Sequence, residues 1–184
     1  MTSTQKFVAA YLPPGFADWE GSVLLPILAA LGFQVRYVSD DGGVRMSLGG
    51  LRVQPDLSVA DLASKPPDVL ILIGSESWLT LPIETPILQV TRLMLEQQKP
   101  AGAICSATVA LAKAGLLRGR KYTSNGQAFL EHFAPGAANP ANYVSRLAVR
   151  EVLEMLGLMS DSRRTNWTAR CAAGELPTAD LFME

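Results

Sequence analysis

The segment PAGAICSAT, Pro100–Thr108, decides the fold class. Its first part, Ala101–Ile104, is a short apolar run typical of a buried strand. Small residues then lead from Cys105 without a break into the helical pattern of Ser106–Ala114. This order predicts a nucleophile elbow, a sharp strand-to-helix turn that projects one side chain from the carboxyl edge of a sheet. Small residues suit such a turn because backbone segments crowd together there.

Strand-like and helical patterns alternate on both sides of the elbow. Alternation of this kind predicts an α/β fold with a mostly parallel sheet and helices on both faces. The expected strands are Lys6–Tyr11, Gln34–Ser39, Val69–Ile73 and Ala101–Ile104, with a small hairpin formed by Val44–Met46 and Leu51–Val53. The expected helices are Ala17–Leu31, Pro82–Gln98, Ser106–Ala114, Gln127–Phe133 and Val149–Leu158.

Length and composition predict one domain over residues 1–184, with a core of about 6–158 and a helical tail over 159–184. The chain is 48% hydrophobic and 18% charged, with a formal net charge of −1. Balanced charge argues against a nucleic-acid partner. No apolar run is long enough for a membrane span, and the N-terminus lacks the layout of a signal peptide, so we expect a cytoplasmic protein. The low charge content, against a typical value of about 25%, favours a homodimer.

Cys105 is the first candidate for chemistry. At the start of a helix, partial positive charge favours the thiolate form. The alternative is a buried, inert cysteine. The second cysteine, Cys171, lies in a polar segment and is interpreted as a bystander. Two cysteines and one histidine are too few for a disulfide framework or a structural zinc site, so we expect neither a metal nor another cofactor.

Two further loops are expected at the same sheet edge, because ligands of α/β sheets bind beyond the carboxyl ends of the strands. Glu20 would lie in the first turn of the helix after the first strand, facing that edge, although a solvated glutamate is the alternative. Gly74, with Ser75 behind it, follows the apolar strand and allows close backbone approach. The backbone amides of Gly74, Ser75 and Ser106 are therefore candidates for an oxyanion hole. A plain strand-to-helix turn is the alternative there.

Three other side chains are candidates for the walls of a pocket. Trp19 and Trp78 flank the two loops and would line an apolar pocket, or pack in the core or on the surface. Asp18 is either a helix N-cap or a second carboxylate of the site, and we favour the N-cap.

The motifs around the elbow resemble the ThiJ/PfpI superfamily, which includes the Parkinsonism-associated deglycase, PfpI-type peptidases and class I glutamine amidotransferase-like domains. The resemblance rests on Ala103–Ala107 (AICSA), Leu111–Arg120, Tyr122–Asn125 and Gly15–Glu20. It implies a flavodoxin-like three-layer α/β sandwich, a reactive Cys105, and a Glu20 carboxyl group that hydrogen-bonds to Cys105.

Two features depart from the superfamily pattern. PfpI-type peptidases have histidine directly after the cysteine, where this chain has Ser106, and the deglycase branch has histidine where this chain has Asn125, which becomes a pocket candidate. The one histidine, His132, is interpreted as a surface or helix-end residue, so a peptidase-like triad is not expected. The connection after Val144 is also about twenty residues shorter than the resemblance implies. A sheet edge left open there would have to be covered.

The leading functional hypothesis is a cysteine-dependent hydrolase or lyase that acts on a small carbonyl or amide compound, with Cys105 as nucleophile and Glu20 tuning it. The first alternative is a sensor in which an oxidant converts Cys105 to sulfenic or sulfinic acid. The second is a stress-related chaperone or interaction module that uses the apolar surface.

Overall fold

The computed structural model describes residues 6–144. The predicted helix Val149–Leu158, the tail over 159–184, the bystander Cys171 and the shortened connection after Val144 lie outside the described residues.

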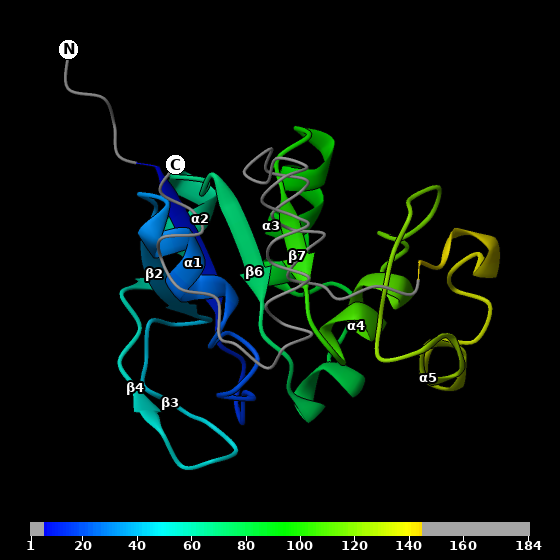
Figure 1. Cartoon of the computed structure of the whole chain (residues 1–184), viewed down its shortest axis with the longest axis horizontal. Helices are drawn as coiled ribbons and strands as arrows, with labels where there is room; N and C mark the ends of the chain where they lie inside the picture. The colour runs from blue at the N-terminus through cyan, green and yellow to red at the C-terminus, as the bar shows by residue number, and fades with distance from the viewer. Residues whose placement is uncertain (1–5, 145–184) are drawn as a thin grey trace, which may run out of the picture.

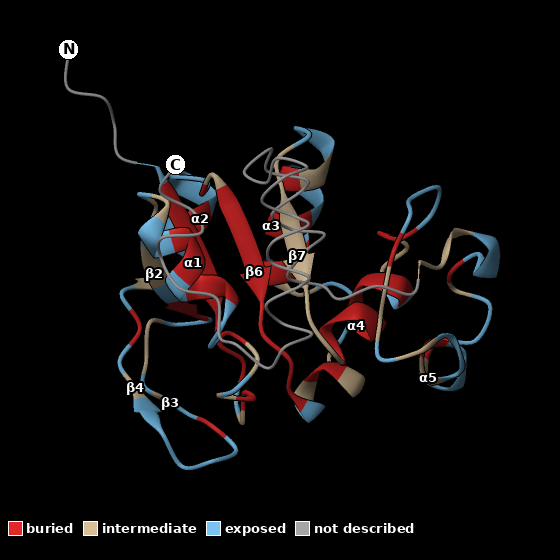
Figure 2. Ribbon diagram, viewed as in Figure 1, coloured by how far each residue is buried: buried red, intermediate tan, exposed pale blue. Residues whose placement is uncertain are grey.

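A five-stranded parallel sheet in the order β5-β2-β1-β6-β7 is the centre of the described structure (Figure 1). The central strands β1 and β6 are buried along their whole length, as Figure 2 shows. This is expected of parallel strands with both faces covered. The predicted α/β fold with a mostly parallel sheet is thus confirmed. The strands are β1 Phe7–Tyr11, β2 Gln34–Ser39, β5 Leu57–Ser58, β6 Val69–Leu72 and β7 Ala101–Ala103.

Alternate residues of the sheet enter two separate hydrophobic clusters, one on each face. In β1, Ala9 and Tyr11 belong to one cluster, whereas Val8 and Ala10 belong to the other. Of the helices in residues 6–144, α1, Leu24–Ala30, covers the second face. The first face is covered by the helices Pro86–Glu96 (α3) and Ala107–Lys113 (α4). The helices Val59–Ser64 (α2) and Gln127–Phe133 (α5) also contribute to its cluster. The result is a three-layer arrangement with the sheet in the middle.

The remaining helices are short. They are α2 Val59–Ser64, α3 Pro86–Glu96, α4 Ala107–Lys113 and α5 Gln127–Phe133, with 3₁₀ turns η1 Glu76–Leu79 and η2 Pro140–Asn142. Within residues 6–144, no helix has the length and apolar character needed to cross a membrane.

The first helix is shorter than the predicted Ala17–Leu31, because Pro26 limits where it can begin. Proline lacks an N–H group and its ring clashes with the carbonyl four residues before it, so an α-helix can contain it only in the first turn. Helix α1 begins at Leu24, which makes Pro26 its third residue. Before it, Glu20 and Ser22 donate their amides three residues back, in a chain of turns. The apolar spacing that predicted a helix continues through this non-helical segment.

The β5–α2 segment was not predicted, because a two-residue strand and a six-residue helix are too short to show periodicity. The sequence nevertheless contains one signal for the start of this helix. Ser58 and Asp61 form a capping box in which the Ser58 hydroxyl accepts from the Asp61 amide and the Asp61 carboxylate accepts from the Ser58 amide.

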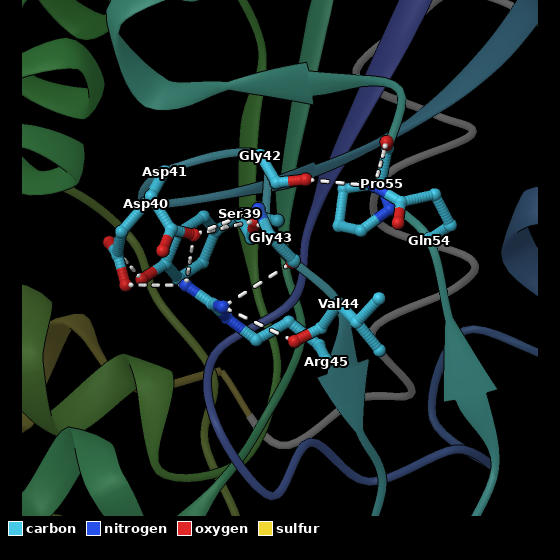
Figure 3. A network of polar contacts seen from close by, with 10 residues as sticks. Ser39, Asp40, Asp41, Gly42, Gly43, Val44, Arg45, Gln54 and Pro55 are labelled. Atoms are coloured by element: carbon cyan, nitrogen blue, oxygen red, sulfur yellow. Dashed lines mark hydrogen bonds and ion pairs between the residues drawn. The ribbon is translucent and has the colours of Figure 1, made fainter.

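The predicted hairpin is confirmed as β3 Arg45–Met46 paired antiparallel with β4 Arg52–Val53. Arg45 anchors it to the end of β2 (Figure 3), since its guanidinium lies 3.0 Å from Asp41 Oδ1 and 3.4 Å from Asp40 Oδ2. The buried hydroxyl of Tyr11 donates to Asp40 Oδ1 at 2.8 Å. Burial and the neighbouring Asp40 raise the pKa of Tyr11, so it remains a neutral donor.

Trp78, in η1, fixes the loop after β6 by packing beneath it. The side chain is fully buried, its indole Nε1 donates to the Ile73 carbonyl at 2.8 Å, and its ring centroid lies 5.4 Å from that of Tyr11. The Ile73 carbonyl is buried and has lost its hydrogen bond to water. The indole N–H replaces that hydrogen bond.

Replacing this indole will therefore destabilise the fold. We expect Trp78→Phe to lower the free energy of unfolding by about 2 kcal/mol, because the Ile73 carbonyl loses its donor. Urea titration at pH 7 measures this change. Trp19→Phe is the matched control, since Trp19 is 62% exposed, and should stay within about 0.5 kcal/mol of wild type. Equal effects of both substitutions would contradict this account of Trp78.

Candidate active site

Cys105 occupies a left-handed backbone conformation at the junction of β7 and α4. Its φ of +55° is one of two positive φ values among the non-glycine residues that the structure describes. Residues other than glycine rarely adopt this backbone conformation, and holding one in it costs of order 1–3 kcal/mol. The chain turns at once into α4, because the amides of Ala107 and Thr108 donate back to Ile104 and Cys105. This geometry is that of a nucleophile elbow.

Gly74 holds the segment that carries Glu20. The Gly74 amide donates to Glu20 Oε2 at 2.6 Å, and the Gly74 carbonyl accepts from the Ala17 amide at 2.9 Å. Glu20 in turn donates its own amide to the Ala17 carbonyl at 3.2 Å. Both backbone polar groups of Gly74 thus bind one short turn. Glu20 is placed by these turns and not by the first turn of a helix.

The position of Gly74 leaves no room for a side chain. A Cβ atom there would lie 2.8 Å from Cys105 Cβ, 2.7 Å from Glu20 Oε1 and closer still to Oε2. Real Cβ atoms essentially never approach other atoms so closely. The glycine therefore allows the carboxyl group of Glu20 and the side chain of Cys105 to share one small space.

The Glu20 carboxyl group has a raised pKa, and burial is the main cause. The Gly74 amide and the hydrogen-bonded side chain of Cys105 oppose the shift, because donors stabilise the charged form. A raised pKa suits a carboxyl group that takes up and returns a proton.

Asn125 is the third side chain at the cysteine. Its Nδ2 donates to Cys105 Sγ at 2.9 Å. The preceding residue is tied to α4, because the hydroxyl groups of Ser124 and Thr108 lie 2.7 Å apart. Cys105, Glu20 and Asn125, predicted from three separate segments, are thus brought together.

Two of the three amides predicted for an oxyanion hole have intramolecular partners. The Gly74 amide binds Glu20, and the Ser75 amide donates to Ser106 Oγ at 3.3 Å. Gly74 and Ser75 would have to exchange these partners before their amides could bind an oxyanion. The third predicted amide belongs to Ser106, which directly follows Cys105 at the start of α4.

Sequence reasoning missed the side chains of Ser75 and Ser106. Ser106 Oγ donates to the Ser75 carbonyl at 2.6 Å, and Ser75 Oγ donates to the Pro14 carbonyl at 2.6 Å. These two hydroxyl groups join the elbow to the loops after β6 and β1. Only the small size of the two residues gave a signal, since hydroxyl partners so distant in the chain leave no pattern in the sequence.

The remaining pocket candidates do not join this group. Trp78 packs in the core, which was one of the alternatives, and Trp19 is 62% exposed. The favoured N-cap role of Asp18 is wrong, because α1 begins at Leu24 and its N-cap is Val23. Asp18 Oδ2 instead accepts from Ser47 Oγ at 2.7 Å and so joins the Glu20 turn to the hairpin.

His132 lies on α5, exposed, with its ring 4.7 Å from that of Phe133. No group of three or more His, Cys, Asp or Glu side chains in the described part of the chain comes together as a possible metal site.

The chain has counterparts among known proteins. The model of the DJ-1/PfpI family matches residues 6–152. The chain belongs to the DJ-1/PfpI family. The flavodoxin-like α/β fold implied by the ThiJ/PfpI resemblance is therefore confirmed.

Individual members differ in how much of the chain they match. The chain is 30% identical over 152 residues to an uncharacterized protease, YoaZ, from Bacillus subtilis, covering 78% of this chain and 72% of that protein. It is 30% identical over 110 residues to the deglycase TK1284 from Thermococcus kodakarensis, covering 60% and 66%. Among solved structures, the DJ-1 superfamily protein Atu0886 from Agrobacterium tumefaciens superimposes with a TM-score of 0.76 at 23% identity, over 92% of this chain and all of that one. The last likeness shows the fold alone.

The raised pKa of Glu20 predicts a pH-dependent stability. A carboxyl group whose pKa is higher in the folded state stabilises the fold fully below its unfolded value, here 4.5, and loses that contribution as pH rises through the folded value. Relative to Glu20→Gln, wild type should therefore lose free energy of unfolding as pH rises above about 4.5. Urea titrations between pH 4 and 8 test this. Glu84→Gln, at an exposed position, corrects for the loss of a carboxyl group elsewhere. The prediction is contradicted if the corrected difference in free energy of unfolding between wild type and Glu20→Gln stays constant or increases as pH rises.

Proposed function

We propose that this chain is a cysteine-dependent enzyme that acts on small carbonyl compounds, with Cys105 as the nucleophile and Glu20 as the group that moves its proton. The observation that carries the proposal is the strained Cys105, whose side chain meets the Glu20 carboxyl group and the Asn125 amide at once. Backbone strain held by surrounding contacts is typical of functional positions.

The chemistry follows from these contacts. Glu20 takes the thiol proton, the thiolate attacks the carbonyl carbon, and the oxygen becomes an alkoxide that takes the proton back. The relatives named deglycases support this class of reaction at the level of the family. A peptidase with a cysteine–histidine pair is not proposed, because Ser106 follows the cysteine and the chain's one histidine is the exposed His132.

A sensor function is the second candidate, and the Asn125 contact favours it too. Peroxide would oxidise the Cys105 thiolate to a sulfenate with release of water, and Asn125 Nδ2 is placed to donate to the added oxygen. This candidate requires a reductant to restore the thiol from the sulfenate, and the enzyme candidate requires a compartment that keeps Cys105 a free thiol. We therefore propose the cytoplasm.

The two candidates differ in turnover. We expect wild type to consume methylglyoxal catalytically and Cys105→Ser to lose at least about a hundredfold in rate, because the nucleophile is removed. Product formation and intact mass measured after separate incubations with methylglyoxal and peroxide test this. Cys171→Ser is the matched control and should retain wild-type turnover. Methylglyoxal turnover by Cys105→Ser would refute the enzyme proposal. An oxygen adduct after peroxide, without turnover of methylglyoxal, would favour the sensor.

We also propose a homodimer that buries an apolar patch on the hairpin and the Glu20 turn. The two segments are joined, since the Gly15 amide donates to the Met46 carbonyl and the Leu48 amide to the Phe16 carbonyl. They carry six of the nine large hydrophobic side chains that stand exposed in residues 6–144, namely Trp19, Val23, Val44, Met46, Leu48 and Leu51. Exposed apolar side chains gathered in this way mark interaction surfaces.

Charge placed in this patch should prevent dimer formation. We expect wild type to sediment as a dimer and Leu48→Glu as a monomer, because a buried unpaired carboxylate opposes association. Analytical ultracentrifugation measures both. Ile83→Glu is the control, since Ile83 is exposed on another loop, and should stay dimeric. A monomeric wild type, or a dimeric Leu48→Glu, would refute the proposed interface.

A further inference from the structure

Asn125 stands in direct contact with the reacting atom. Its Nδ2 lies 2.9 Å from Cys105 Sγ. A carboxamide nitrogen carries two N–H groups, so one remains when the other is directed at sulfur. A carboxamide neither gives up nor takes up a proton near neutral pH. Asn125 can therefore stabilise negative charge at this place, whereas proton transfer falls to Glu20.

The segment of Asn125 is held from two sides. Thr108, one turn along α4 from the cysteine, bonds to the Ser124 hydroxyl, and the Tyr143 hydroxyl donates to the Ser124 carbonyl at 3.4 Å. Tyr122 also forms a parallel bridge with Tyr143. These contacts hold the backbone next to Asn125, and the carboxamide itself is held by its contact with Cys105 Sγ. A donor that is positioned before the substrate binds is the condition for effective electrostatic stabilisation.

Two of the three backbone amides predicted for an oxyanion hole are already engaged, whereas the Ser106 amide remains a candidate donor beside Asn125. The Gly74 amide binds Glu20 Oε2 at 2.6 Å, and the Ser75 amide binds Ser106 Oγ. Freeing the Gly74 amide would release the carboxyl group that must accept the thiol proton. The Asn125 carboxamide reaches the cysteine side chain without such a loss.

We propose that Asn125 is a catalytic residue that donates one N–H to the Cys105 sulfur and the other to the alkoxide formed when that sulfur adds to a carbonyl carbon. The inference rests on the proposed function and assigns the oxyanion donor within it. The sulfur electron pair forms the new S–C bond, the π pair of the carbonyl moves onto oxygen, and that oxygen takes from Glu20 the proton that the thiol gave up. The carbonyl oxygen, bonded to the attacked carbon, lies within reach of the same carboxamide.

The rates of two reactions of Cys105 distinguish the contact with sulfur from the contact with the alkoxide. Alkylation of Cys105 by iodoacetamide requires the thiolate and forms no oxyanion, whereas addition to methylglyoxal forms one. For Asn125→Ala at pH 7 we expect alkylation to slow about tenfold, because a charge-assisted hydrogen bond is lost. Loss of the free thiol to methylglyoxal should slow by about 10²–10³-fold, because the oxyanion donor is lost as well.

Two other variants sharpen the test. Asn125→Asp keeps the size of the side chain but replaces the donor with a carboxylate, so both rates should fall below those of Asn125→Ala. Gln127→Glu adds the same charge two residues further on, at the exposed start of α5, and should keep both rates near wild type. Thermal unfolding of each variant checks that the fold is retained.

The outcomes distinguish this inference from the proposed function. If Asn125→Ala slows methylglyoxal addition no more than it slows alkylation, the oxyanion role is refuted, even where wild type turns methylglyoxal over. If addition depends on Asn125 in the expected way but no product is released, the inference stands and the enzyme proposal fails. If wild type forms no adduct with methylglyoxal, both fail.

Discussion

The close approach of Gly74 to Cys105 is the constraint on which the rest of the site depends. A side chain at Gly74 would collide with both the Glu20 carboxyl group and Cys105. Because the glycine has none, its backbone N–H and its carbonyl can both bind the Glu20 turn. The carboxyl group and the cysteine then occupy a single space, even though 85 positions of the chain separate them.

The strain at Cys105 persists because several elements hold the elbow. Strand β7 fixes the chain before it, and α4 begins directly after it. The Ser106 hydroxyl then links the elbow to the loop that follows β6. A left-handed residue costs of order 1–3 kcal/mol and survives only where its surroundings over-determine it. The contact of Cys105 with Glu20 is therefore a property of the whole sheet edge.

The sequence predicts the sheet well because its strands are apolar runs bounded by turn residues, as in Val69–Ile73. It predicts the first helix poorly, because apolar spacing continues through turns that Pro26 keeps out of the helix. Cys105 and Glu20 could be predicted from their places after strands and from the family resemblance. The hydroxyl of Ser106 could not, since its partner Ser75 lies 31 residues away and neither the spacing nor the residue type indicates the contact.

Asn125 lies on an irregular segment, outside the sheet, whose backbone is held by the bridge between Tyr122 and Tyr143 and by the Tyr143 hydroxyl at the Ser124 carbonyl. The elbow and the Glu20 turn, by contrast, are built into the paired strands and their neighbouring loops. A substitution at Asn125 therefore changes what the cysteine meets while leaving the hydrophobic layers untouched. Another side chain could replace the carboxamide as the third partner of the cysteine without rebuilding the scaffold. This modularity gives a physical reason why one fold can diverge into proteins with different reactivities.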